Sequence, residues 1–389
     1  MKKEPFSNLW SVLAMVVVLL AFGLRLRYLT LFSFHIDEFY TLAAARLIAE
    51  TGVPRFPTGL FYDPGLPFSY LDGWLFRGVG FDEALGRWPA VIFGVLAVAT
   101  VYWLGIRVLR SPGVGVLAAL WLASNVDSVE WGGRARMITL AQWLALLSAG
   151  LLWMNLSRPS LRRRWTFTVC YGLTLLTHFS TIVLLPAWFA VAAVLKWTGR
   201  ALRPRALLQD ALLLLLISGL ALSSGVVFQP PPSVDFQRSG GGLEAKVGLL
   251  IGKFLRFPSD LGHAWKTYGG YFADSPYVLL LALAMAGIAV SAFRRRKEDA
   301  PPTEGILFLA TIFVTVMGVL FLGINPHWQR ARYLSMQNLG IFFLLAAYGF
   351  WEVVIWVSGF AGSSSSLRRG VGMAGALLLL WPFRLSLRQ

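Results

Sequence analysis

Long apolar runs recur along almost the whole chain and decide what it can fold into. They cover residues 9–24, 88–106, 112–129, 137–156, 165–197, 207–228, 277–293, 305–324, 334–357 and 371–387. A helix needs about 20 apolar residues to cross a bilayer. Because 57% of the residues are hydrophobic and only 14% are charged, the chain also lacks the polar surface of a soluble domain. These features exclude a soluble enzyme, a disordered chain and a disulfide-stapled protein, and they predict a polytopic membrane protein.

The apolar run over residues 165–197 decides the number of spans. As one helix it would be about 50 Å long, whereas the hydrocarbon core of a bilayer is about 30 Å thick. Basic residues stand at both ends of this run, which places both ends on the same side of the membrane. We therefore expect a hairpin with its turn near His178-Phe179-Ser180. The resulting fold is an all-α bundle of about eleven transmembrane helices with its N-terminus inside.

The charges divide between the two faces of this topology. The short inner loops hold 18 of the 35 basic residues, as the positive-inside rule expects. The net charge of +16 therefore reflects orientation and anionic membrane lipids, and nucleic acid is not expected as a partner. The outer loops hold 13 of the 19 acidic residues, including Asp72. This acidic bias lies outside the positive-inside rule and indicates that the outer face carries the chemistry.

Two of the outer loops, 25–87 and 229–276, are long. Loops beyond about 12–15 residues in a compact protein are usually functional or disordered. In the first loop we expect short helices near 38–50 and 66–77. In the second, the apolar stripe of Glu244–Phe257 predicts a helix that lies in the membrane interface. We expect one transmembrane domain over residues 1–389, with no C-terminal soluble domain.

The pair Asp37-Glu38 is the sharpest local feature of the chain. It follows the first apolar run by a few residues and begins an amphipathic segment in apolar surroundings. Two adjacent carboxylates at the membrane surface can take part in acid–base chemistry. The alternative interpretation is helix capping, with Asp37 as the N-cap residue and Glu38 in the first turn. The dipeptide by itself does not decide between these interpretations.

Several motifs in a fixed order resemble those of a known group of membrane enzymes. Asp37-Glu38 after the first helix is followed by the motif Arg87-Trp88-Pro89, then Glu130–Met137, then Thr177-His178-Phe179, and finally Arg330-Ala331-Arg332-Tyr333. This series resembles the GT-C-type membrane glycosyltransferases, in the branch of the protein O-mannosyltransferases and the lipid A aminoarabinose transferases. The resemblance covers roughly residues 5–350. Each motif is short, and the specificity lies in their order and their placement on the predicted outer side.

The resemblance implies a sugar donor carried on a polyprenyl phosphate, with inverting transfer to a hydroxyl on the outer face. The acceptor would be a lipid, a glycan or a protein. Asp37 is the implied base, and partial desolvation is expected to raise its pKa. Glu38 is the second catalytic candidate, and Asp127 and Glu130 are candidates for a second acidic point near the acceptor. The departing phosphate requires positive charge, and the donor-phosphate candidates are Arg332 first, then Tyr333, Arg134, Arg136 and Lys253.

Some of these roles have other interpretations. The three arginines could simply lie at lipid headgroups, and the acidic residues could be solvated. His178 could bind a metal or orient a carboxylate. The chain has four histidines without close metal-ligand spacing. We therefore expect that no cofactor is required, and the sequence leaves open a divalent ion held by Asp37 or Glu130 with His178.

Other functions compete with transfer of a sugar. A transporter or flippase of lipid-linked sugars would place ionisable groups near the midplane of its spans. Here the centres of the apolar runs are almost free of charge, which favours an enzyme. A membrane-embedded glycan polymerase or a non-enzymatic scaffold is the third class. We expect a multi-pass protein of the cell (plasma or inner) membrane whose site faces outside.

Overall fold

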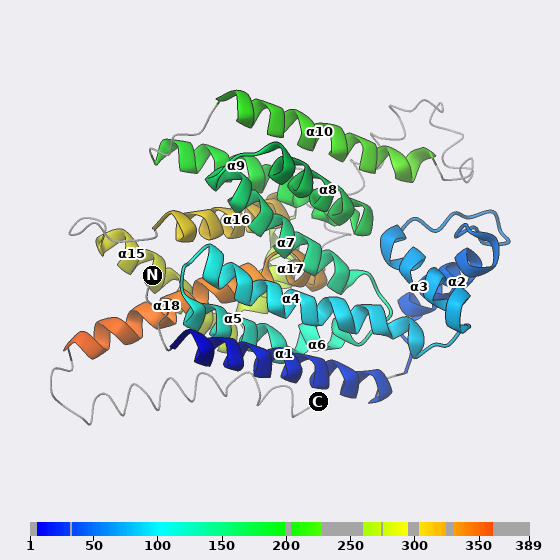
Figure 1. Ribbon diagram of the computed structural model, residues 1–389, viewed down its shortest axis with the longest axis horizontal. Coiled ribbons are helices and arrows are strands. Elements are labelled where there is room, and N and C mark those ends of the chain that lie inside the picture. Colours follow the sequence, from blue (N-terminus) through cyan, green and yellow to red (C-terminus); the bar gives the residue numbers. More distant parts are fainter. Residues whose placement is uncertain are drawn as a thin grey trace.

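The computed structural model describes residues 6–31, 33–198, 204–227, 260–273, 275–294, 303–323 and 330–360. Within these ranges the chain is helical apart from its turns and one isolated bridge between Arg55 and Phe61. Figure 1 shows a bundle of helices with one smaller helical pair at one end. The all-α membrane fold predicted from the apolar runs is therefore confirmed.

Six helices in the described ranges are long and apolar enough to cross a membrane, or eight if each of two bent helix pairs is one span. The six are α1 (Phe6–Leu31), α4 (Trp88–Arg107), α7 (Ile138–Ser157), α9 (Leu184–Trp197), α10 (Pro204–Val227) and α16 (Thr303–Leu322). The run over 371–387 and the interfacial helix Glu244–Phe257 lie outside the described residues. The count of eleven spans stays a prediction.

The run over 165–197 forms the predicted hairpin. The helix α8 (Leu161–Thr177) ends at His178, a 3₁₀ turn η2 (Phe179–Val183) follows, and α9 runs away from it. His178 makes this turn by accepting a hydrogen bond from the backbone N–H of Ser180, 3.2 Å from its Nδ1. The imidazole thereby satisfies a backbone donor in the first turn of η2, which has no partner within that short helix.

The first predicted outer loop begins later than expected, because α1 continues through Arg25 to Leu31. It then folds into α2 (Ile36–Thr51) and α3 (Leu66–Val79), close to the two short helices predicted there. Both helices pack together at one end of the bundle, at the right in Figure 1. Leu42 and Ala45 of α2 meet Phe76 of α3 in a small apolar cluster, which makes this loop a folded unit. Gly52 ends α2 with a φ of 83°, a conformation that favours glycine.

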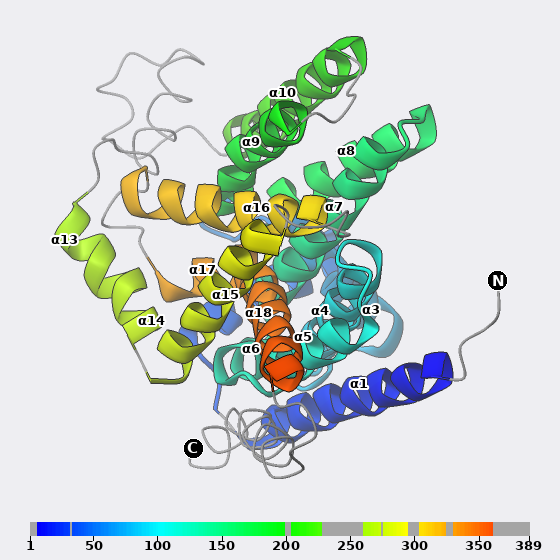
Figure 2. The ribbon, with the colours of Figure 1, turned by 90° about the vertical axis from the view of Figure 1, so that its left-hand side faces the viewer.

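The centre of the bundle is built by α4, α5 (Pro112–Ser124), α7 and α18 (Leu339–Phe360). Figure 2 shows α18 nearly end-on, between α5 and α15 (Ser275–Arg294). The one-residue break at Asn125 separates α5 from α6 (Val126–Gly132), which bends away by 64°. Before α15 lie α13 (Leu261–Ala264), a π-helical turn η3 (Trp265–Gly269) and α14 (Gly270–Ala273). The run predicted over 334–357 is split into α17 (Ala331–Gln337) and α18, so Arg332 lies on a short helix of its own.

Candidate active site

The N-terminus of α2 presents Asp37 and Glu38 in different directions. His35 is the N-cap residue, because its Nδ1 accepts a hydrogen bond from the backbone N–H of Asp37 at 3.2 Å. Glu38 completes the capping box by accepting from the backbone N–H of His35 at 2.9 Å. The interpretation of Asp37 as the N-cap residue is therefore wrong: a neighbour caps the helix, and the Asp37 carboxylate is available for other contacts.

Glu38 is buried and joins four segments of the chain, one of them through Arg87. Its Oε1 accepts hydrogen bonds from Arg87 Nε at 2.9 Å and from the backbone N–H of Ala135 at 2.8 Å. Its Oε2 accepts from Arg87 Nη2 at 3.2 Å and from the backbone N–H of His35. Arg87 is itself buried and also donates to the Leu29 carbonyl at 2.9 Å. With four donors around it, the Glu38 carboxylate holds α1, α2, the start of α4 and the α6–α7 connection together.

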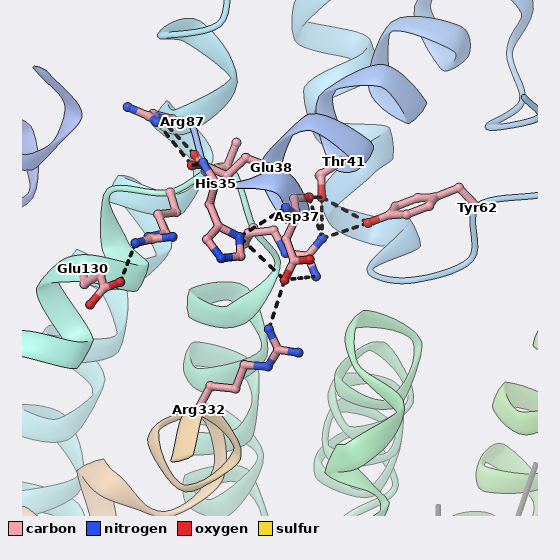
Figure 3. A network of polar contacts seen from close by, with 11 residues as sticks. His35, Asp37, Glu38, Thr41, Tyr62, Arg87, Glu130 and Arg332 are labelled. Carbon is pink, nitrogen blue, oxygen red and sulfur yellow. Dashed lines mark hydrogen bonds and ion pairs between the residues drawn. The ribbon is translucent and has the colours of Figure 1, made fainter. Parts of the chain in front are cut away.

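Asp37 lies between two arginines that come from distant parts of the sequence (Figure 3). Arg332 Nη1 donates to its Oδ2 at 3.1 Å, and Arg136 Nη2 lies 3.9 Å from the same oxygen. The side chain of Asp37 is 31% exposed, so the ion pair is partly open to its surroundings. The structure therefore brings the first and last sequence motifs to one point.

The pKa of Asp37 is lowered, which corrects the expectation of a raised value. Burial of the carboxyl is the largest influence and would raise its pKa. The charge of Arg136 and the hydrogen bond and charge of Arg332 act in the opposite direction and together outweigh burial. Asp37 is therefore an ionised acceptor at neutral pH.

Arg136 is held rigidly beside this carboxylate. Its Nη1 donates to the Asp37 carbonyl at 2.9 Å, to Thr41 Oγ1 at 2.8 Å and to the Tyr62 hydroxyl at 2.9 Å. The Nε atoms of Arg136 and of Arg332 are both buried and have no hydrogen-bond partner in the described part of the chain. Two guanidinium groups beside one carboxylate leave an excess of positive charge at this point.

His178 and Tyr333 lie close to these two arginines. Their rings meet edge to face with centroids 5.5 Å apart. Burial and then the charges of Arg136 and Arg332 lower the pKa of His178 to about 3, so the imidazole is neutral. Burial raises the pKa of Tyr333, which keeps its hydroxyl protonated as a hydrogen-bond donor. The predicted donor-phosphate residues Tyr333, Arg332 and Arg136 thus lie together.

The second acidic group lies on α6 and is placed differently. Glu130 forms an ion pair with Arg134 at 2.5 Å, and Arg134 lies over the Trp131 ring. Asp127 interacts with the hydroxyl of Tyr271. Asp72, counted among the outer acids, is fully buried in α3 with neither carboxylate oxygen paired in the described residues. Lys253 lies outside the described residues.

The residues around His178 do not fit a divalent cation. No three His, Cys, Asp or Glu side chains gather in a metal-binding group among the described residues. The charged groups closest to the imidazole are guanidiniums, which repel a cation, and its Nδ1 is already used by Ser180. A metal site built from Asp37 and His178 would first have to displace Arg332.

Two important residues received no role from the sequence. The sequence marks Arg87 only as part of the motif Arg87-Trp88-Pro89, and it carries no signal for Tyr62. A buried arginine and a buried glutamate separated by 49 positions cannot be paired from one sequence. Arg25 is also fully buried, and its position at the end of an apolar run was the available signal, since charges inside spans are rare.

The arrangement of the helices is similar to that of two kinds of solved structure, an archaeal oligosaccharyltransferase and ArnT. No family model matches the chain, and no curated protein matches it. Among solved structures, it is similar to the apo oligosaccharyltransferase of Archaeoglobus fulgidus, with a TM-score of 0.64 and 16% identity over 97% of this chain. The chain spans 55% of that protein's length.

A second similar structure is ArnT from Cupriavidus metallidurans bound to undecaprenyl phosphate. The TM-score is 0.57 and the identity 13%, over 98% of this chain and 75% of that one. A third is AglB from Archaeoglobus fulgidus with an inhibitory peptide and a dolichol-phosphate, with a TM-score of 0.59 and 16% identity, over 98% of this chain and 56% of that one. At these identities the likeness establishes the fold, and it agrees with a multi-pass membrane protein.

Proposed function

We propose that the protein is an inverting glycosyltransferase that moves a sugar from a polyprenyl-phosphate donor to a hydroxyl acceptor on the outer face of the membrane. The observation that carries this proposal is the contact of Arg332 with Asp37. It brings a permanently charged guanidinium to an ionised carboxylate. A displacement at the anomeric carbon needs both groups, one for the leaving phosphate and one for the acceptor proton.

In the proposed step, the acceptor oxygen attacks the anomeric carbon while its proton passes to Asp37. The bond from the anomeric carbon to the phosphate oxygen breaks, and the electron pair leaves with the phosphate. The guanidinium groups of Arg332 and Arg136 stabilise the charge on that phosphate. The neutral His178 and the protonated Tyr333 provide uncharged donors beside them.

Arg332 is expected to exchange partners during this cycle. In the structure it neutralises Asp37, so the sugar cannot lie between the two groups while the ion pair is closed. A donor phosphate competes for the guanidinium, and its arrival releases the carboxylate toward the acceptor. The fold likeness to structures bound to undecaprenyl phosphate and dolichol-phosphate supports this class of donor.

The test is transfer by the purified protein in proteoliposomes with synthetic undecaprenyl-phosphate hexoses and pentoses, followed by mass spectrometry. Asp37→Asn should abolish release of undecaprenyl phosphate while leaving its binding measurable, and Arg332→Ala should weaken that binding. Glu50→Gln is the matched control, because Glu50 is on the same helix but exposed at its other end. Full transfer by Asp37→Asn, or flux of the intact lipid-linked sugar without any product, would contradict the proposal.

A further inference from the structure

Arg25 of α1 is a fully buried guanidinium that contacts both sides of the α5–α6 break. Its Nη2 donates to Ser128 Oγ, in the first turn of α6, at 2.8 Å. Its Nη1 donates to the Ala123 carbonyl, in the last turn of α5, at 3.4 Å and to the Ala21 carbonyl at 3.1 Å. No carboxylate forms an ion pair with it in the described part of the chain. A buried cation without a counter-charge is costly, which makes its position at the break informative.

Two glycines make room for the Arg25 side chain. A Cβ added to Gly94 of α4, or to Gly132 at the end of α6, would lie 2.5 Å from Arg25 Nε. Real Cβ atoms essentially never approach that closely, so neither position accepts a larger residue without displacing the guanidinium. Gly94 and Gly132 thus allow α4 and the end of α6 to pack directly against the Arg25 side chain.

The break itself depends on polar contacts. Asn125 separates the two helices and caps α6 by accepting a hydrogen bond from the Ser128 N–H at 2.9 Å. The end of α5 leaves carbonyls without helical partners, and Arg25 takes one of them at Ala123. Asn125 and Arg25 therefore converge on Ser128, one through its backbone and the other through its hydroxyl.

We propose that Arg25 is a positioning residue that fixes the 64° bend between α5 and α6, and thereby places the acidic helix α6 relative to Asp37. The proposal rests on the proposed function in one respect, because α6 carries Asp127 and Glu130, the acceptor-side candidates. The neighbouring turn of α1 supports the same geometry, since the Leu29 carbonyl binds Arg87, the partner of Glu38. The C-terminal end of α1 therefore contacts both acidic segments. It reaches α6 through Arg25, and it reaches Glu38 of α2 through Arg87.

The experiment measures the position of α6 relative to α2, without any substrate. Nitroxide labels at Phe39 of α2 and Val129 of α6 report the distance between the two segments by electron–electron double resonance, and the native Cys170 is buried and can stay. Arg25→Met and the milder Ser128→Ala should each broaden and shift the distance distribution. Arg27→Met, an exposed arginine half a turn further along α1, is the control and should not. A distribution unchanged in Ser128→Ala and in every folded Arg25 variant would overturn the proposal.

Activity provides the second measurement. Misplacement of a reacting group by about 1 Å can cost about 10²-fold in rate, so we expect Ser128→Ala to lower kcat by tenfold or more. Binding of undecaprenyl phosphate should be unchanged, because Arg332 and Arg136 are not on α6. An equal loss of rate and of binding would show general damage and refute a positioning role. A wild-type protein that binds no undecaprenyl phosphate would overturn the proposed function, whereas the label distances would still decide the role of Arg25.

Discussion

Replacing Glu38 by glutamine tests whether this residue stabilises the fold or takes part in the reaction. The substitution keeps the shape of the side chain but removes the negative charge that Arg87 neutralises while almost wholly buried. Removing one partner of a buried ion pair typically costs about 3–5 kcal/mol. Here Arg87 keeps its bond to the Leu29 carbonyl and its position over the Phe34 ring, 4.3 Å from the ring centroid. We therefore expect the free energy of unfolding to fall by an amount near the lower end of this range, about 3 kcal/mol.

The assay is thermal unfolding in detergent, in a double-mutant cycle with Arg87→Met. A loss of about 3 kcal/mol corresponds to a drop of roughly 5–10 °C for a domain of moderate size. The double variant should lose less than the sum of the single variants, because it leaves no buried unpaired charge. If Glu38→Gln keeps the wild-type melting temperature but abolishes transfer, Glu38 acts directly in the chemistry and our assignment of it as a structural group is refuted.

Two further predictions concern pH. Arg136 and Arg332 hold the pKa of Asp37 below its usual range, so transfer should persist down to a pH below the ordinary pKa of an aspartate. Arg332→Ala should move this acid limb of the pH profile to higher pH. A wild-type limb near neutral pH would assign the base to another group. Burial holds the pKa of Asp72 well above its usual range, so the folded protein retains a proton that the unfolded chain releases, and stability is lost as the pH rises. Asp72→Asn should therefore raise the melting temperature more at pH 7 than at pH 4, and an equal effect at both would contradict the assignment.

The apolar pattern predicts the fold well because the bilayer imposes it. Spans, the hairpin at His178 and the two short helices after the first span all follow from hydrophobic length and from basic residues at the ends of runs. These are properties of local sequence, so one chain suffices to read them. The end of α1 was misjudged because Arg25 looks like the start of a polar loop, whereas glycines on other segments make room for it inside the bundle.

The site was predictable in its members but not in its pairings. The motifs point to Asp37, Arg332 and Arg136, and the structure brings them together. The direction of the Asp37 pKa depends on the opposition between burial and two arginines 99 and 295 positions away. Such long-range contacts leave no trace in spacing. The same holds for Glu38, whose capping role was foreseen and whose ion pair with Arg87 was not.

The adjacency of Asp37 and Glu38 has a practical consequence for engineering. Successive residues of a helix point about 100° apart. Glu38 therefore fixes the start of the helix, while Asp37 points toward Arg136 and Arg332. Because Glu38 lies at the start of α2, the turn around Gly59, beyond the far end of that helix, does not set where Asp37 points. An epitope inserted at Gly59 should therefore leave the direction of Asp37 unchanged, and the protein stays active where Tyr62, three residues further on, keeps its hydrogen bond with Arg136.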